Sequence, residues 1–258
     1  MRKETAVSRP RLRERDKMYQ FDSRIRYSET DSEGKLSFMA LLNYFQDCST
    51  FQSEDAGVGI KYCLDRNLVW VLNAWQIIPI RMPRLGEKVT VGTLPYDFQK
   101  FMGQRNFMMF DQDGNYLAKA NSIWSLIDIK TERFVTPDEA MLKGYPVEER
   151  IPMEYAGRKI AVPAGGSVAD PIAVMTHHLD SNHHVNNGQY VAMALEFLPE
   201  GAKIRQMRAE YKKQAFLGDV LHPYVATEEG RVVVSLQDEG GKAFAAVELA
   251  LDENNGGK

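Results

Sequence analysis

The feature that most constrains how this chain can fold is an internal repeat, because the same order of elements occurs twice. Residues 37–56 carry apolar side chains at the spacing of one helical face, with Ser37 as predicted N-cap and Gly57 and Gly59 closing the pattern. A shorter helical segment, residues 187–198, lies in the second half. A chain built twice on one plan predicts two similar folding units.

The segments after each helix predict antiparallel strands. They are residues 68–80, 88–93, 103–110 and 116–129 in the first half, and 204–212, 220–226, 231–236 and 243–251 in the second. Matching turns join them, because Leu85-Gly86-Glu87 corresponds to Leu217-Gly218-Asp219. A helix with one apolar stripe and a sheet with one apolar face each need a partner, so we expect each half to be a helix wrapped by a curved sheet. Two such sheets can pair edge to edge and so cover their exposed edges.

The sequence predicts four parts along the chain. Residues 1–17 are a flexible basic tail, 18–136 the first unit, 137–170 a proline-rich extended linker, and 171–252 the second unit. The tail is expected to be a frayed polar end, with a docking strip for an acidic partner as the weaker alternative.

Composition narrows the partners and the compartment. The formal net charge of −3 gives no reason to expect nucleic acid as a partner. No apolar run approaches the roughly 20 residues that a membrane span needs. Cys48 and Cys63 lack metal-site spacing and are expected to be free buried thiols. Without a secretory signal pattern, a cytoplasmic location is expected. The oligomeric state stays open, a homodimer included.

The stretch 177–187 concentrates polar chemistry just before the second helix, since it holds four of the chain's five histidines. Apart from a plain solvated loop, three interpretations compete. Histidine and aspartate could bind a metal, although the stretch lacks the i, i+4 histidine pair of a metalloprotease. Asn186 and Asn187 could cap the helix as parts of a structural turn. The stretch could also be a catalytic loop.

The catalytic interpretation depends on side-chain alternation. In an extended segment, the side chains of Asp180, Asn182 and His184 fall on one face, so a carboxylate, an amide and an imidazole lie side by side. The start of the following helix offers backbone N–H groups and a positive dipole end, which suit a developing oxyanion. We therefore expect an enzyme site here, with no metal and no cofactor.

Residues 180–187, Asp-Ser-Asn-His-His-Val-Asn-Asn, resemble the Asp-x-Asn-x-His-Val-Asn-Asn motif of the acyl-acyl-carrier-protein thioesterases of plants and bacteria. The resemblance extends over most of residues 18–251. It implies an α+β fold, a tandem double hot-dog in which each half is a long helix wrapped by a curved antiparallel sheet. It also implies hydrolysis of long- or medium-chain acyl thioesters on acyl carrier protein, with release of free fatty acid.

The same resemblance implies roles for the site residues. Asp180 would position or activate the attacking group, Asn182 would hold the carbonyl or orient water, and His184 would transfer protons. This sequence departs from the family at residues 210–215, which are Glu-Tyr-Lys-Lys-Gln-Ala where the family has Glu-Tyr-Arg-Arg-Glu-Cys. Gln214 cannot titrate and Ala215 has no thiol. We therefore expect Asp180 and His184 to activate water, with Gln214 orienting it.

The first half lacks the full motif. Residues 28–35 keep Asp31 but have neither histidine nor asparagine at the matching positions, as expected for a decayed duplicate. That half would then be free to enclose the acyl chain. Core packing is the competing explanation for each proposed lining residue. By position alone, the lining candidates are Phe45, Trp70, Leu72 and Trp75.

An acidic carrier protein would suit a basic surface near the site, for which Lys212 and Lys213 are candidates, with Arg205 and Arg208 nearby. A solvated strand face explains these side chains equally well. The competing functions are a coenzyme A thioesterase, a dehydratase, a non-catalytic acyl-thioester binding protein and a metal-dependent hydrolase.

Overall fold

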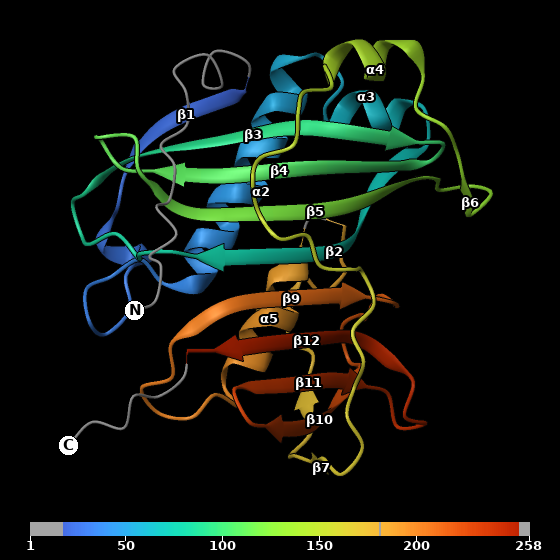
Figure 1. Cartoon of the computed structure of the whole chain (residues 1–258). Coiled ribbons are helices and arrows are strands. Elements are labelled where there is room, and N and C mark those ends of the chain that lie inside the picture. The colour runs from blue at the N-terminus through green and yellow to red at the C-terminus, as the bar shows by residue number, and fades with distance from the viewer. Residues whose placement is uncertain (1–17, 181, 253–258) are drawn as a thin grey trace. The chain divides into compact units, whose positions relative to one another are not determined.

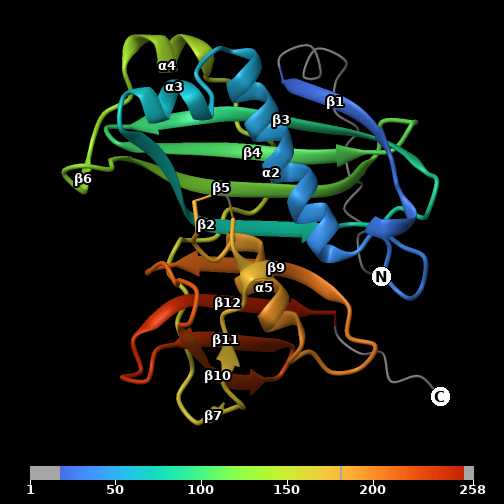
Figure 2. The ribbon, with the colours of Figure 1, turned by 180° about the vertical axis from the view of Figure 1, so that it is seen from behind.

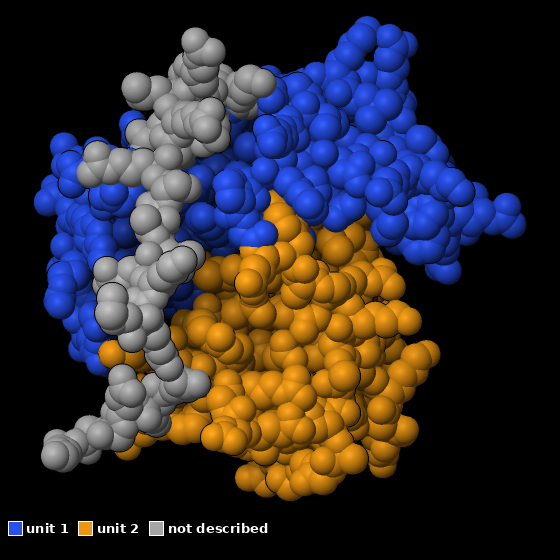
Figure 3. Space-filling model, viewed as in Figure 1, with its two compact units in different colours: residues 1–70, 79–121, 125–153 blue, residues 71–78, 122–124, 154–258 orange. Residues whose placement is uncertain are grey.

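The computed structural model describes residues 18–180 and 182–252, so the predicted basic tail lies outside the described residues. The chain divides into two compact units. Unit 1 comprises residues 1–70, 79–121 and 125–153, and unit 2 comprises residues 71–78, 122–124 and 154–258 (Figure 3). Unit 2 therefore includes residues 71–78 and 122–124 from the first half of the chain.

Unit 1 is a long helix against an antiparallel sheet. Helix α2 (Phe38–Asp55) crosses one face of the strands, as Figure 2 shows. The strand order is β1 (Tyr19–Arg24), β3 (Lys88–Gln99), β4 (Met102–Phe110) and β5 (Tyr116–Asp128), and β6 (Arg133–Phe134) pairs with β5. Three short helical segments, η1 (Tyr27–Glu29), α3 (Ile60–Asp65) and α4 (Glu139–Gly144), complete the unit.

The sequence explains why α2 forms where it does. The Ser37 hydroxyl accepts a hydrogen bond from the Ala40 N–H at 3.2 Å, as predicted for an N-cap. One stripe of the helix, Leu41, Phe45, Cys48 and Gln52, is buried. Phe45 packs on Phe107 of β4, with ring centroids 5.5 Å apart, so this stripe faces the sheet.

Unit 2 repeats the plan with a shorter helix, α5 (Asn187–Leu195) (Figure 1). Its sheet contains residues 71–78 of β2 (Leu68–Pro79), followed by β9 (Ile204–Tyr211), β12 (Ala243–Leu251), β11 (Arg231–Gln237), β10 (Val220–Glu228) and β7 (Ser167–Val168). The short strand β8 (Ile172–Ala173) pairs with β10, and η2 (Thr176–His178) precedes the helix. A first-half strand therefore pairs with a second-half strand, in the register Ala74↔Glu210 to Ile77↔Met207.

The internal repeat is confirmed at the level of single hydrogen bonds. In unit 1, the Gly86 N–H donates to the Ile25 carbonyl at 2.9 Å, and in unit 2 the Gly218 N–H donates to the Val174 carbonyl at 3.3 Å. Both glycines adopt the left-handed conformation, with φ of +79° and +90°. The predicted correspondence of Leu85-Gly86-Glu87 with Leu217-Gly218-Asp219 therefore describes the same turn in both units.

Some features differ from the sequence prediction. Strand β1 and helix α3 were not predicted, and the linker contains α4, whose N-cap Asp138 accepts from the Met141 N–H at 2.9 Å. Helix α5 ends at Leu195 instead of 198. Both cysteines are buried and unpaired, as predicted. Among the described helices, none has the length and apolar character required to cross a membrane.

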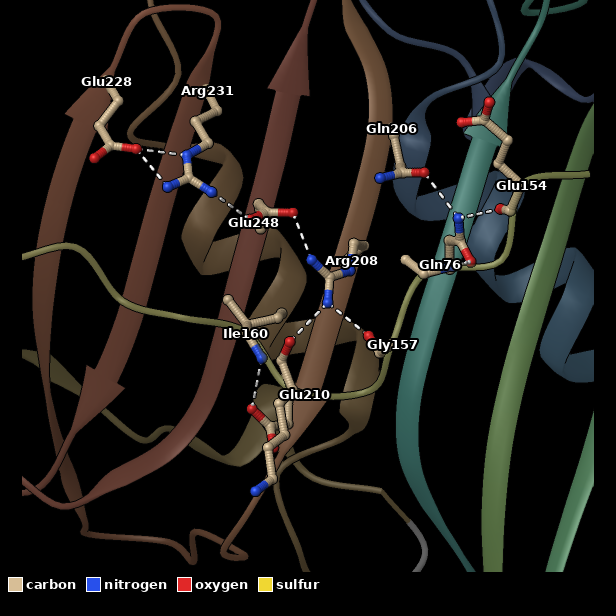
Figure 4. Close-up of polar contacts among 12 residues, drawn as sticks. Gln76, Glu154, Gly157, Ile160, Gln206, Arg208, Glu210, Glu228, Arg231 and Glu248 are labelled. Carbon is tan, nitrogen blue, oxygen red and sulfur yellow. Dashed lines mark hydrogen bonds and ion pairs between the residues drawn. The ribbon is translucent and has the colours of Figure 1, made fainter.

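A polar cluster fixes the linker to unit 2 (Figure 4). Arg208 and Glu210 of β9 alternate with residues that face α5, so they point to the opposite side of the sheet. There the Arg208 guanidinium donates to the carbonyls of Gly157 and Lys159 at 2.6 and 2.8 Å. Glu210 accepts from the Ile160 N–H at 3.1 Å.

Glu248 on the neighbouring strand completes this cluster by joining two arginines. Its carboxylate accepts from Arg208 at 2.8 Å and from Arg231 at 3.0 Å. Arg231 also pairs with Glu228 nearer the solvent. Side chains of three adjacent strands therefore tie the linker to the sheet of unit 2.

Candidate active site

The loop before α5 is a tight turn built around Asp180. The carboxylate oxygen Oδ1 of Asp180 accepts from the backbone N–H of Asn182 at 2.8 Å and of His184 at 3.2 Å. The Asp180 N–H in turn donates to the His184 carbonyl at 2.8 Å. The prediction that residues 180–184 form an extended segment is therefore wrong. Aspartate side chains readily bond the backbone two and four residues ahead, and this closes the chain into a turn.

The turn changes the expected geometry of the three candidate side chains. Alternation along a strand no longer places Asp180, Asn182 and His184 on one face. Among the described residues, no hydrogen bond joins these three side chains to one another. Asp180 and His184 are half-buried, and Asn182 is exposed. The backbone brings Asp180 and His184 together, because residues 179 and 185 form an antiparallel bridge.

Unit 1 contains a turn with the same hydrogen bonds, built around Asp31. Asp31 Oδ1 accepts from the backbone N–H of Glu33 at 2.9 Å and of Lys35 at 3.0 Å, and the Asp31 N–H donates to the Lys35 carbonyl at 2.8 Å. The sequence match between Asp31 and Asp180 thus has a structural cause. Since the turn in unit 1 carries Lys35 where unit 2 carries His184, formation of the turn does not require the histidine.

The two turns differ at the position that needs a left-handed backbone. Gly34 occupies it in unit 1 with φ of +70°, whereas His183 occupies it in unit 2 with φ of +61°. Glycine adopts this conformation without cost, but another residue type is strained there by roughly 1 kcal/mol or more. A histidine held at this position of unit 2 is therefore less stable than a glycine would be, as is common at functional sites.

Helix α5 begins directly after the turn. The Asn186 side chain accepts from the Gly188 N–H at 2.8 Å, which confirms its predicted capping role. The Gln189 N–H donates to the Asn186 carbonyl at 2.8 Å. These two amides are therefore occupied. No described residue outside the helix accepts a hydrogen bond from the Asn187 N–H, so this first-turn amide is the candidate donor to an approaching oxyanion.

Three aromatic side chains that the sequence analysis did not single out support the turn. The Phe216 ring lies edge-on to His184, with centroids 5.0 Å apart. The Tyr190 hydroxyl accepts from the Ala215 N–H at 3.0 Å, and Tyr211 donates to the Asn187 carbonyl at 3.0 Å. Their helical and strand periodicity marks the two tyrosines as inward-facing, but nothing in the sequence pairs them with this loop.

Burial and charge affect these tyrosines. Burial raises the pKa of Tyr190 to about 12, and the nearby carboxylates of Asp219 and Asp180 add to the increase. Burial also raises the pKa of Tyr211 far above its usual value. Both hydroxyls therefore stay protonated across the physiological range, so they act as hydrogen-bonding groups and not as bases.

Two of the four clustered histidines lie in η2. The His178 Nδ1 accepts from the Met175 N–H at 2.9 Å, and the His177 and His178 rings have centroids 4.1 Å apart. Burial lowers the pKa of His178, and the adjacent His177 lowers it further. Within residues 18–180 and 182–252, no group of three or more His, Cys, Asp or Glu side chains is arranged to hold a metal ion.

Gln214 lies on the segment next to the turn. Ala215, the residue after Gln214, accepts a hydrogen bond at its carbonyl from the Val185 N–H at 2.9 Å. The next residue, Phe216, forms a β-bridge with His184. The Gln214 side chain is exposed. The backbone thus brings residue 214 beside the turn, and its role in the site stays a prediction.

The proposed basic surface is smaller than the sequence suggested. Lys212 and Lys213 are exposed and lie near Glu210 and Asp238, at 3.4 and 3.1 Å. Arg205 is exposed. Arg208, however, is held by Glu248 and two linker carbonyls, so its inclusion in a docking surface is wrong.

The four candidate lining residues are buried to different degrees and lie in different units. Phe45 and Trp70 belong to unit 1, and Leu72 and Trp75 to unit 2. Phe45, Leu72 and Trp75 are at most 2% exposed, and Trp70 is half-buried. Burial of this degree is also what plain core packing produces, so their contact with an acyl chain stays a prediction.

Each unit, a helix wrapped by an antiparallel sheet, has the hot-dog architecture, and the chain is a tandem of two such units. The aspartate turn occurs in both units, but only the turn of unit 2 carries Asn182 and His184. Comparison with solved structures supports this class. An acyl-ACP thioesterase from Bacteroides thetaiotaomicron matches with a TM-score of 0.85 at 24% identity, over 93% of this chain and 99% of that one. The 12:0-ACP thioesterase from Umbellularia californica matches with a TM-score of 0.80 at 20% identity, over 91% and 97%.

Family models identify the chain more narrowly. The acyl-ACP thioesterase N-terminal domain matches residues 16–145, and the C-terminal domain matches residues 165–249. The chain belongs to the acyl-ACP thioesterase family.

Curated relatives agree with this family. The chloroplastic acyl-[acyl-carrier-protein] hydrolase FATB1 of Cuphea viscosissima is 26% identical over 79% of this chain and 53% of its own length. The chloroplastic dodecanoyl-[acyl-carrier-protein] hydrolase of Umbellularia californica is 26% identical over 80% and 58%. The chain spans about half the length of the curated relatives it matches.

Proposed function

We propose that this protein hydrolyses acyl thioesters carried by acyl carrier protein and releases free fatty acid. The observation that carries the proposal is the Asp180 turn at the start of α5, within a chain whose two halves match the family's two domains. The family relatives are named as hydrolases of this substrate class. The acyl carrier protein is accordingly the proposed partner, and a cytoplasmic location stays our expectation.

The geometry supports different roles for the two carboxylate oxygens of Asp180. Oδ1 is used by two backbone amides, and this leaves Oδ2 to accept a proton-bearing group such as water or the His184 ring. His184 is suited to proton transfer because a neutral imidazole has one nitrogen that can accept a proton and one that can donate a proton. Asn182 is exposed on the turn, where its amide can meet the substrate carbonyl.

Water, deprotonated by the Asp180 and His184 pair, attacks the thioester carbonyl carbon, and the carbonyl oxygen becomes an oxyanion. The Asn187 N–H and the Asn182 amide stabilise this oxyanion. When the carbonyl re-forms, the C–S bond breaks, and the proton taken from water is returned to the thiolate. One water and one thioester give one fatty acid and one thiol.

The most direct experiment is a substrate panel. Thiol release would be measured on matched acyl-carrier and acyl-coenzyme A thioesters of several chain lengths, and we expect the carrier thioesters to give the higher kcat/KM. Higher kcat/KM on coenzyme A esters would favour the alternative coenzyme A thioesterase. Tight binding of every thioester without thiol release would favour the alternative of a non-catalytic binding protein, for which the untitratable Gln214 is the supporting observation.

Gln214→Glu tests whether the departure from the family limits the rate. A carboxylate placed beside the turn could share in deprotonating water, so we expect kcat to rise. Steady-state hydrolysis measures the effect, with Gln214→Met as the size-matched variant that keeps no polar group. If Gln214→Glu and Gln214→Met reduce kcat equally, the amide itself is required and the proposed role in orienting water is strengthened.

Charge reversal at Lys212 and Lys213 tests the docking surface. Because the carrier protein is acidic, Lys212→Glu with Lys213→Glu should raise KM for the carrier substrate several-fold, roughly 10-fold at low salt. The effect should shrink as salt is added. KM for the matching coenzyme A thioester serves as the internal control, and an equal rise for both substrates would contradict carrier docking at these lysines.

A further inference from the structure

Unit 1 buries a guanidinium that has no acidic partner among the described residues. Arg105 on β4 is 8% exposed, and its Nη1 atom has no hydrogen-bond partner among residues 18–180 and 182–252. The side chain faces α2, because Phe107, two residues further along the strand, packs on Phe45 of that helix. Burial lowers the pKa of Arg105, and the groups that counter this effect are Tyr145 and Cys48, not a carboxylate. Arginine keeps its proton in proteins, so the buried charge needs a partner.

Two further polar atoms of unit 1, on Trp70 and Gln52, are buried without a hydrogen-bond partner among the described residues. The Arg105 Cζ atom is 5.3 Å from the centre of the Tyr145 ring, and the Trp70 ring centroid is 6.4 Å from it. The Tyr145 hydroxyl donates to the Ser53 hydroxyl of α2 at 2.9 Å. Gln52 lies on the buried stripe of the same helix, one turn beyond Cys48. The Trp70 Nε1 and Gln52 Oε1 atoms are buried and unpartnered within the described part of the chain, and Gln52 as a whole is 7% exposed.

Apolar side chains surround Tyr145, and Trp70 packs against the same cluster. Tyr145 packs in a buried cluster with Val58, Cys63, Leu126 and Met141, and its ring stacks on Phe98 at 6.2 Å. A buried donor or acceptor without a hydrogen-bond partner is strongly unfavourable, so nearly all buried polar groups in native proteins are hydrogen-bonded. Two donors and one acceptor in an apolar setting match a ligand with an apolar body and one oxygen group.

We propose that Arg105, Trp70 and Gln52 bind an oxygen substituent on the acyl chain, so that the substrates include hydroxylated or carboxylated acyl thioesters. This inference rests on the proposed thioesterase function and names a substrate class for it. A hydroxyl can accept from Arg105 or Trp70 and donate to Gln52, while a carboxylate would neutralise the guanidinium.

The test compares carrier thioesters of one chain length that are plain, hydroxylated at successive carbons, or carboxylated at the far end. For wild-type protein, at least one oxygenated chain should have kcat/KM about 10-fold above that of the plain chain, the range expected for a hydrogen bond to a charged group. In Arg105→Met, this preference for the oxygenated chain should be lost, so that the two kcat/KM values become equal. Gln104 is adjacent to Arg105 and lies on the opposite face of β4, so Gln104→Met should keep the preference of the wild type.

Several outcomes would overturn the proposal. One is a wild-type preference for the plain chain at every position, as expected if water alone meets these atoms. Another is an unchanged ratio in Arg105→Met. If Arg105→Met fails to fold by circular dichroism, Gln52→Leu and Arg105→Lys replace it, and the ratio must fall in at least one of them.

A binding measurement separates this inference from the proposed function. Calorimetric titration of wild-type protein with free hydroxy, dicarboxylic and plain fatty acids needs no turnover. Tighter binding of an oxygenated acid, lost in Arg105→Met, would support the site even if no thioester were hydrolysed. Hydrolysis of thioesters with equal binding of all the acids would support the function and reject the site.

Discussion

Asp180→Asn should lower kcat on acyl-carrier thioesters by about 100- to 10,000-fold, the range typical of general acid–base groups. The substitution is informative because an asparagine oxygen can still accept from the backbone amides of residues 182 and 184, as Asp180 Oδ1 does. The turn should therefore persist, while the negative charge is lost. Steady-state kinetics with a thermal unfolding scan of the same preparation separates the two effects.

The chain supplies its own matched control in unit 1. Asp31 makes the same two backbone contacts, so Asp31→Asn removes the same charge from the same kind of turn. We expect that variant to keep wild-type kcat. Full activity in Asp180→Asn would mean that Asp180, like Asp31, is a turn-forming residue alone, and equal losses in both variants would point to a general effect on folding.

Glu248→Ala should destabilise the protein by about 3 kcal/mol or more, since removing one partner of a buried ion pair leaves the other charge uncompensated. Glu248 joins Arg208 and Arg231, and Arg208 also holds the linker carbonyls of Gly157 and Lys159. Equilibrium unfolding in urea measures the free energy of unfolding. Because Glu248 lies on the face opposite α5, the remaining folded fraction should still turn over substrate.

The neighbouring pair gives the control for this prediction. Glu228 binds the same Arg231 but is exposed, so Glu228→Ala should change stability by about 1 kcal/mol or less. If both substitutions have equally small effects, the linker is held by its hydrogen bonds to Arg208 and not by the ion pairs.

Much of the fold could be predicted because its signals are local or repeated. The stripe of apolar residues with Ser37 gives α2 to within a residue, and Ala243–Leu251 matches β12 at both ends. Strand β1 was missed because its six residues alternate between half-buried and exposed and carry little apolar signal. Helix α4 was missed because it is only six residues long and lies in a proline-rich stretch, which favoured an extended linker over a helix with Asp138 as its N-cap.

The site was harder to predict, since its geometry depends on one side chain closing a turn. Alternation predicts a shared face for Asp180, Asn182 and His184 only if the backbone is extended, and the two bonds accepted by Asp180 prevent that. The correspondence with Asp31 was visible in the sequence, but it did not by itself predict that both segments form a turn. The roles of Phe216 and Tyr190 could not be inferred, because they come from contacts between segments distant in the chain.

The most direct measurement is fatty acid release from a long-chain acyl-carrier thioester by the wild-type chain and by His184→Ala, side by side in the presence of a chelator. We expect chelator-resistant turnover by the wild type and a loss of about 100-fold or more in His184→Ala. His177→Ala, an exposed histidine of the same stretch, should match the wild type. Equal release by His184→Ala and wild type, or loss of wild-type activity in the chelator, would contradict hydrolysis by this turn.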